Sequence, residues 1–244
     1  HIDLFDPKPA IRKLHGTELP APVITPGARD GNFTNEGGVC GTTRLLKNIG
    51  GLWLLQSCRR SWAASGQVID YDELLAATRN EPPSFKALFD PDHPAFLHPD
   101  DMVATIADRC RQTGQPEPSG PAGYSLAIFE SLAMKYRMVL ESLEALTGRK
   151  FTEIRIVGGG ARNRLLNQFA ADATGRRVVA GPVEATALGN IAMQMLATGA
   201  VATLAEARAV IDRSFPVGRY EPRAAETWDR QYRRFQEYVE LTCV

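Results

Sequence analysis

Residues 153–163 read EIRIVGGGARN, a short apolar stretch that runs directly into three consecutive glycines. The apolar residues predict a buried strand, and helical spacing after the glycines predicts a helix over 162–174. Glycine loses more conformational freedom on folding than any other residue, so three in succession need a physical reason. Either the chain turns tightly here, or a ligand approaches the main chain.

A strand that ends in glycines and continues into a helix can hold a phosphate group. Main-chain N–H groups approach the anion, and the helix start adds free donors and a positive dipole end. The stretch lacks both the Walker Gly-Lys-Ser/Thr and the dinucleotide glycine spacing. Asn163 is expected either to cap the helix or to offer its amide to a nucleotide. These residues alone leave a structural turn and a nucleotide contact both open.

The chain downstream of the glycines predicts a parallel α/β unit. A second strand, RRVVAG, follows the helix over 162–174, and a second helix over 184–198 follows that strand. Strand–helix–strand–helix with short links is typical of a parallel sheet. Two further helices, over 203–213 and 223–241, are expected to close the chain.

The chain upstream predicts mostly helix. Apolar residues at spacings of three and four predict a long helix over 122–147, which Gly148 should end. Shorter helices are expected over 70–79 and from 99 to about 112. We also expect one helix over 43–64, weakened at Gly50-Gly51 unless a backbone or a ligand packs there. Residues 1–31, rich in proline, predict extended or loosely packed chain.

Composition excludes several function classes. The 244 residues carry 28 basic and 28 acidic side chains, so no bulk charge indicates a nucleic-acid or membrane partner. No apolar run approaches the ~20 residues of a membrane span. The four cysteines match no zinc pattern, and we expect no metal site and reduced, mostly buried thiols in a cytoplasmic protein. They are Cys40, Cys58, Cys110 and Cys243.

Two long motifs together carry a family resemblance. Residues 156–194, IVGGGARNRLLNQFAADATGRRVVAGPVEATALGNIAMQ, resemble the carboxyl-terminal domain of the FGGY carbohydrate kinases. Residues 34–56, TNEGGVCGTTRLLKNIGGLWLLQ, resemble the rhamnulokinase branch of that family. The resemblance implies a ribonuclease-H-like fold of the actin and hexokinase type. It also implies ATP-dependent phosphorylation of L-rhamnulose to L-rhamnulose 1-phosphate, in rhamnose catabolism.

The resemblance also assigns site residues. Gly159, with Gly158 and Gly160 beside it, corresponds to the glycine that contacts ATP, and Asn163 would line the nucleotide pocket. Gln56 matches a nucleotide-contacting glutamine, and Asn48 matches a residue on the sugar side. In the expected helix over 43–64, positions 48 and 56 would be about two turns apart on one face.

The resemblance leaves out the amino-terminal kinase domain, which would carry the general base. No catalytic residue and no metal ligand is therefore assigned, and Mg²⁺ would be carried by ATP. Residues 1–18 are expected to be an extended segment foreign to the family. Residues 19–244 would be the nucleotide-binding domain, with an early strand missing and one sheet edge open. We expect the isolated chain to lack kinase turnover and to need the missing domain as its partner.

Two alternatives stay open from the sequence. One is a non-catalytic, actin-like module that binds a nucleotide without transferring phosphate. The other is half of a kinase for another ketose, such as xylulose or fuculose, because sugar choice would depend mainly on the amino-terminal domain.

Overall fold

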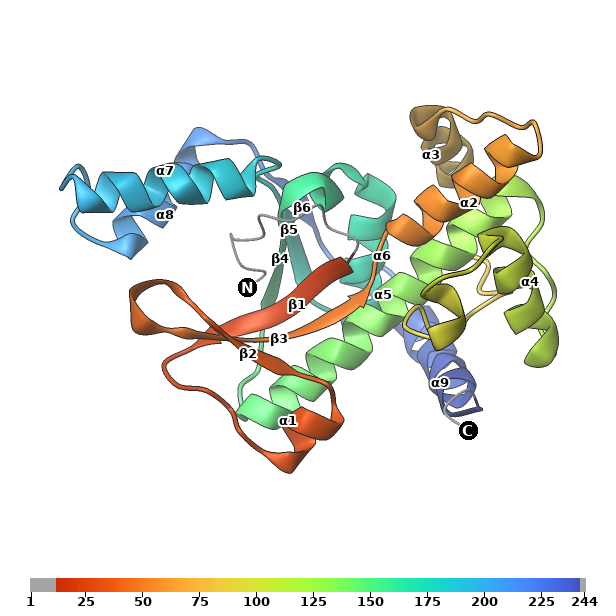
Figure 1. Cartoon of the computed structure of the whole chain (residues 1–244), viewed down its shortest axis with the longest axis horizontal. Coiled ribbons are helices and arrows are strands. Elements are labelled where there is room, and N and C mark those ends of the chain that lie inside the picture. The colour runs from red at the N-terminus through yellow and green to blue at the C-terminus, as the bar shows by residue number, and fades with distance from the viewer. Residues whose placement is uncertain (1–11, 242–244) are drawn as a thin grey trace.

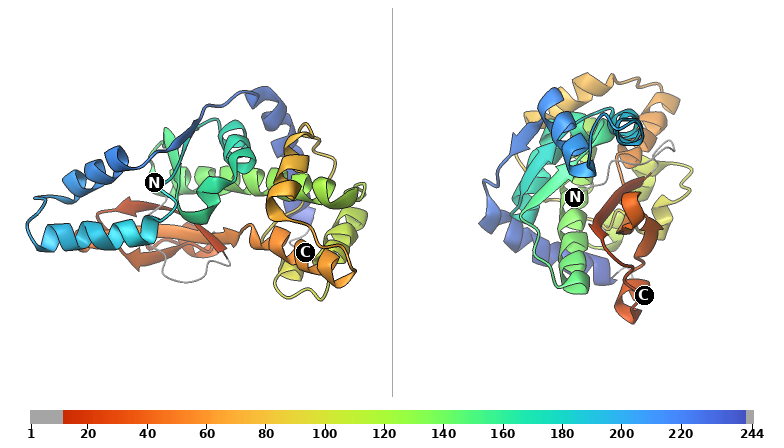
Figure 2. Two further views of the ribbon diagram at one scale, coloured as in Figure 1. Left: turned by 90° about the horizontal axis from the view of Figure 1, so that it is seen from above. Right: turned by 90° about the vertical axis from the view of Figure 1, so that its left-hand side faces the viewer.

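The computed structural model describes residues 12–241, which form a mixed α/β body with a projecting helical arm (Figure 1). A long helix, α5, runs through the body, and two small sheets lie beside it (Figures 1 and 2). The arm is the pair α7 and α8, at the left of Figure 1. The α-helices are α1 (Pro26–Asp30), α2 (Trp53–Ala64), α3 (Tyr71–Arg79), α4 (Met102–Gln112), α5 (Gly120–Thr147), α6 (Arg164–Thr174), α7 (Ala185–Ala197), α8 (Leu204–Ser214) and α9 (Ala225–Leu241).

The first sheet is antiparallel and contains β1 (Arg12–Leu19), β2 (Thr34–Gly37) and β3 (Thr43–Gly50) in the order β1-β3-β2. β1 and β3 approach closely at Gly16, where a Cβ atom would lie 2.6 Å from the Leu45 carbonyl oxygen. Side chains alternate along β3: Leu45 and Ile49 are fully buried, whereas Asn48 is exposed on the other face.

The expectation of a single helix over 43–64 is therefore wrong for its first half. Residues 43–50 are a strand, and α2 begins only at Trp53, after Gly50-Gly51. The run of leucines and isoleucine fits a buried strand as well as a buried helix, and pairing with β1 and β2 on both sides favours the strand. The glycine pair separates the two elements.

The second sheet confirms the parallel unit. β4 (Glu153–Ile156) pairs in parallel with β5 (Arg177–Ala180), and α6 connects them. The sequence did not predict β6 (Gly218–Tyr220), which adds an antiparallel strand to β5. The two three-stranded sheets are not joined by hydrogen bonds among the described strands, which fits an incomplete ribonuclease-H-like sheet.

The amino-terminal expectation needs correction. Residues 12–18, expected to be extended or loosely packed chain, are extended but tightly paired with β3 as most of β1. Residues 26–30 form the short helix α1, whose start Thr25 caps by accepting a hydrogen bond from Ala28 N. β1 is a strand because it pairs with β3, and the spacing of residues in this proline-rich stretch did not indicate that pairing. Residues 1–11 lie outside the described residues.

The core is built around α5, which packs against β1, β3, α2, α3 and α6. Its residues Ile128, Phe129 and Leu132 are completely buried. Gly148 ends the helix in the left-handed conformation, with a φ of 64°, as its position after an amphipathic run predicts. β3 and α2 thus both pack against α5.

The arm is a helical hairpin with a small core of its own. Ala192 of α7 packs near Val201, Ala207 and Ile211 of the loop and α8. An ion pair of 2.7 Å between Arg208 of α8 and Glu18 of β1 ties the arm to the first sheet.

The free cysteines differ in exposure, and one lies outside the described chain. Cys58 and Cys110 are buried and Cys40 is exposed, while Cys243 lies outside the described residues. Within residues 12–241, no helix combines the length and apolar character needed to cross a membrane.

Candidate functional site

The glycine turn occupies the carboxyl end of β4. Residues Gly158–Arg162 form a 3₁₀ turn that leads into α6. Gly158 has a φ of +72°, and its N–H donates to the Pro182 carbonyl at 3.0 Å. Only glycine adopts this backbone conformation without strain, so the fold itself explains Gly158.

Gly159 differs from Gly158. It is exposed, its φ lies outside the left-handed region, and no atom lies within 4 Å of the place where a Cβ would stand. The described protein atoms therefore give no reason for a glycine at this position. A ligand that approaches the main chain would give one.

Asn163 caps α6, which confirms the structural half of the sequence prediction. Its Oδ1 accepts a hydrogen bond of 3.0 Å from Leu166 N, and the side chain is almost completely buried. Its Nδ2 has no hydrogen-bond partner of ordinary geometry within the described chain. Asn167, one turn later, likewise leaves its buried Oδ1 unpaired while its Nδ2 donates to the Ala161 carbonyl. Unpaired buried polar atoms are costly, so a donor and an acceptor at one helix start fit a polar ligand or bound water.

Tyr71, at the start of α3, lies against Asn163 and was not singled out from the sequence. Burial raises the pKa of the Tyr71 hydroxyl, and the neighbouring Asn163 side chain partly opposes that rise. The guanidinium of Arg59 lies 5.5 Å from the centre of the Tyr71 ring. Arg59 belongs to α2, so these contacts connect α2, α3 and the start of α6.

Gln56 is exposed on α2, one turn before Arg59. Residues three apart on a helix share a face, so Gln56 lies on the same face of α2 as Arg59, which contacts Tyr71. α2 starts without a side-chain cap at Leu52. Gln56 therefore lies on α2 after the Gly50-Gly51 junction, and its contact with a nucleotide stays a prediction.

Asn48 lies on β3, not on a helix, so the helical-face argument for Asn48 and Gln56 is wrong. Its side chain is exposed on the face of β3 opposite Lys47, and Lys47 faces α5. The alternation of strand side chains therefore places Asn48 on the outer face of the first sheet. Asn48 and Gln56 flank the Gly50-Gly51 junction from its two sides.

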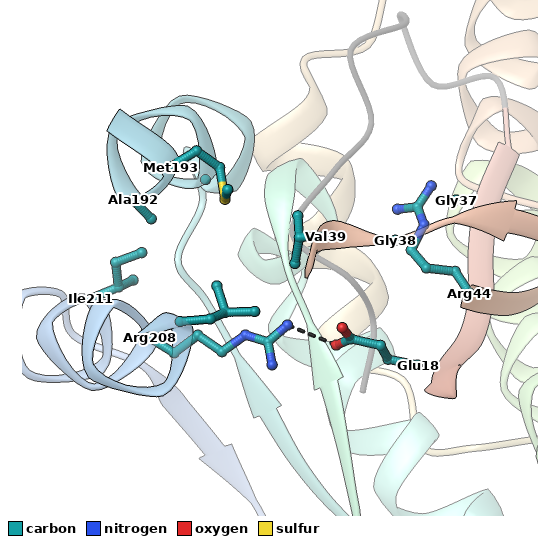
Figure 3. A pocket seen from close by; sticks show the side chains of 11 residues that line it. Glu18, Gly37, Gly38, Val39, Arg44, Ala192, Met193, Arg208 and Ile211 are labelled. Atoms are coloured by element: carbon teal, nitrogen blue, oxygen red, sulfur yellow. Dashed lines mark hydrogen bonds and ion pairs between the residues drawn. The ribbon is translucent and has the colours of Figure 1, made fainter. Parts of the chain in front are cut away.

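A cavity of about 250 Å³ lies between this outer face and the arm (Figure 3). Glu18 and Arg44 line it from the sheet, and Met193 and Ile211 line it from the arm. Burial acts to raise the pKa of Glu18, but hydrogen bonds from Thr42 and Arg208 lower it overall. None of the predicted site residues lines this cavity, so it is separate from the glycine turn.

No cluster of three or more metal-ligating side chains is present between residues 12 and 241.

Comparison with known proteins identifies the family. The model of the FGGY family of carbohydrate kinases, C-terminal domain, matches residues 13–198. The chain belongs to the FGGY family of carbohydrate kinases. The match begins within the segment that the sequence led us to expect as foreign, so the boundary at residue 18 stays a prediction.

Curated FGGY relatives are similar over most of the chain. The rhamnulokinase of Bacteroides thetaiotaomicron is 46% identical over 226 residues, which are 93% of this chain and 46% of that protein. The rhamnulokinase of Pectobacterium carotovorum is 44% identical over 91% of this chain and 44% of its own length. The chain therefore spans about half the length of the curated relatives it matches.

Solved FGGY-type structures share the fold. Xylulose kinase from Rhodospirillum rubrum superposes with a TM-score of 0.64 at 17% identity, covering 95% of this chain and 46% of that one. Gluconate kinase from Lactobacillus acidophilus gives 0.63 at 13% identity, covering 96% of this chain and 44% of that one. At this identity the likeness shows the fold, which is of the actin and hexokinase type.

Proposed function

We propose that this chain is the nucleotide-binding half of a kinase that transfers the terminal phosphoryl group of ATP to L-rhamnulose. The product would be L-rhamnulose 1-phosphate. The relatives at 42–46% identity support this proposal because each is a rhamnulokinase. Their length indicates that the other half of such an enzyme corresponds to residues that this chain does not match.

Gly159 is the observation that carries the nucleotide site. Its glycine identity has no explanation in the surrounding protein, and it lies four residues before Asn163, whose side-chain Nδ2 lies beside Tyr71 and has no other partner within the described chain. Main-chain N–H groups at such a turn can bind phosphate oxygens, and the start of α6 adds a favourable dipole. The chemistry of this donor set fits a nucleotide's phosphates.

The proposed roles follow the positions of the side chains. Gly158, Gly159 and Gly160 would present main-chain donors to the phosphates, and Asn163 and Gln56 would contact the nucleotide. Asn48 would face the sugar from the outer face of β3. Mg²⁺ would arrive bound to the ATP phosphates and offset their charge during transfer. The general base that takes the sugar hydroxyl proton is expected in the half of the relatives that this chain does not span.

Titration with ADP, followed by amide NMR, tests the proposal. Resonances of residues 158–163 should shift with ADP and Mg²⁺, together with the side-chain amides of Asn163 and Gln56. A folded protein in which these resonances stay unmoved at millimolar ADP contradicts the nucleotide site. Titration with L-rhamnulose should shift the side-chain amide of Asn48.

The relatives do not favour a non-catalytic actin-like module. A kinase for xylulose or fuculose would bind a different ketose. Parallel titrations with xylulose, fuculose and L-rhamnulose show which of the three sugars the chain binds. Location in the cytoplasm stays a prediction, and the free thiols of Cys58 and Cys110 are compatible with it.

A further inference from the structure

Lys135 is a buried lysine in the most apolar part of α5. Only 4% of its surface is exposed, and its helix neighbours Ala133, Met134 and Tyr136 are buried as well. A buried ammonium group is costly unless it is paired and hydrogen-bonded. A methionine would fill the same volume without this cost, so packing alone does not explain a lysine here.

Two carboxylates from the segment between α3 and α4 surround this ammonium group. Lys135 Nζ lies 2.7 Å from Asp90 Oδ1 and 3.1 Å from Asp92 Oδ2. Burial acts to lower the pKa of Lys135, but both carboxylates raise it overall, so the lysine is charged at neutral pH. Asp90 also accepts a hydrogen bond from Asp92 N at 2.9 Å, which fixes the turn between them. We call Lys135, Asp90 and Asp92 the Lys135 ion cluster.

The cluster reaches the junction between β3 and α2 through Asp92. The second oxygen of Asp92, Oδ1, accepts a hydrogen bond from Gly50 N at 2.5 Å. The Pro91 carbonyl oxygen would lie 2.5 Å from a Cβ on Gly50, so the 90–92 turn packs directly onto this glycine. Lys47 also faces the cluster from β3, where burial and then the charge of Lys135 lower the pKa of Lys47, and the two aspartates oppose that fall. Lys47 does not share the role of Lys135, because its ammonium group donates to the Gly31 carbonyl.

We propose that Lys135 is a positioning residue, which holds Asp92 on the Gly50 amide and so fixes the junction between Asn48 and Gln56. Asn48 lies two residues before Gly50, and Gln56 lies six residues after it. A rotation of the backbone at Gly50-Gly51 would move β3 relative to α2 and separate the two side chains. The proposal rests on the proposed function for the roles of Asn48 and Gln56, but the held junction is a property of the chain itself.

Lys135→Met tests the proposal, with Glu130→Gln as the matched control. Glu130 lies on the same helix, is equally buried, and holds the same segment through Ser84 N and Phe85 N, away from Gly50. Three quantities are measured in each folded variant: exchange of the Gly50 amide hydrogen, the side-chain amide resonances of Asn48 and Gln56, and the dissociation constant for ADP. Lys135→Arg, which keeps the positive charge, should change these three quantities less than Lys135→Met does.

In Lys135→Met we expect faster exchange at Gly50, shifted amides of Asn48 and Gln56, and ADP binding about 10-fold weaker. Glu130→Gln should change the melting temperature without changing these three quantities. Unchanged exchange at Gly50 in folded Lys135→Met overturns the proposal, as does equal loss in the control. If Lys135→Met does not fold, Asp92→Asn, which keeps an oxygen for Gly50 but loses the ion pair, decides by the same measurements.

The experiment separates this proposal from the proposed function. If the unmodified chain binds no ADP, the nucleotide site fails, while the Gly50 exchange and the Asn48 and Gln56 resonances still decide the role of Lys135. If ADP binds and Gly50 exchange rises in Lys135→Met without any loss of affinity, the positioning role is wrong and the nucleotide site stands.

Discussion

At the scale of single residues, Gly158 and Gly159 are adjacent glycines with different physical reasons to be glycine. Gly158→Ala places a side chain at a φ of +72° and should lower the free energy of unfolding by ~1–2 kcal/mol. Gly159→Ala meets open space and should change stability by less than ~0.5 kcal/mol. If a nucleotide lies against Gly159, the same substitution should weaken ADP binding about 10-fold. Thermal melts and calorimetric titration of both variants measure the difference.

The opposite pattern would contradict this explanation of the turn. A Gly159→Ala variant that loses stability but binds ADP normally would show that Gly159 has a structural role, as Gly158 does. Gly158→Ala serves as the control for general damage to the turn, because its expected loss is in stability first.

Glu130 gives a pH dependence with a definite sign. Burial raises the pKa of its carboxyl to about 7, and hydrogen bonds from Phe85 N and Ser84 N only partly oppose this. Because the folded pKa lies above the unfolded one, folding favours the protonated form. The resulting stabilisation is fully present below about pH 4.5 and is lost as the pH rises through about 7.

We therefore expect Glu130→Gln to flatten part of the stability profile. Between pH 4.5 and 7 the unfolding free energy of the unmodified chain should fall relative to the variant, by at most about 1.4 kcal/mol per pH unit. Urea unfolding at intervals across this range measures the difference. A constant difference between the two proteins across the range would show that Glu130 does not titrate there.

At the scale of elements, the β1–β3 pair depends on Gly16. A Cβ at this position would lie 2.6 Å from both the Leu45 carbonyl oxygen and the Leu46 Cβ, so Gly16→Ala forces the strands apart. We expect a loss of ~1–3 kcal/mol in unfolding free energy and faster amide exchange along β1. Gly37→Ala, on β2 with no atom within 4 Å of the added carbon, is the control and should leave both unchanged within ~0.5 kcal/mol. Equal behaviour of the two variants would contradict the close β1–β3 approach.

The elements that could be predicted from the sequence are those whose signals are local. The long apolar repeat of α5, the glycine that ends it, and the strand–helix–strand unit around α6 each follow from spacing and from caps within a few residues. β1 could not be predicted, because its partner strand β3 lies 24 or more residues away in the sequence. β3 was predicted as a helix, because its apolar run fits a buried helix as well as a buried strand. The same limit explains the site: Gly159 and Asn163 stand in a local motif, whereas Tyr71 joins them only through tertiary packing.

At the scale of the whole molecule, the chain matches only about half the length of its rhamnulokinase relatives. Under the proposed function the glycine turn would hold the phosphates and the outer face of the first sheet would hold the sugar. The chain spans 46% of the Bacteroides thetaiotaomicron rhamnulokinase. In the FGGY arrangement that we propose, transfer requires a general base from the other half and closure of the two halves around the substrates. The 244 residues alone should therefore bind ADP but form no L-rhamnulose 1-phosphate.

Complementation tests this prediction directly. The purified chain, the separately produced amino-terminal half of the Bacteroides thetaiotaomicron rhamnulokinase, and their mixture are each incubated with ATP, Mg²⁺ and L-rhamnulose, and ADP release is followed. Only the mixture should show release that depends on the sugar, and Gly159→Ala in this chain should lower that rate because the added Cβ keeps the phosphates away from the main-chain donors. Sugar-dependent turnover by the chain alone would mean that one of its own carboxylates takes the hydroxyl proton. Silence of a mixture whose halves are shown to associate would contradict the proposal that this chain supplies a working nucleotide site, because the rhamnulokinase half would then supply both the general base and the sugar site.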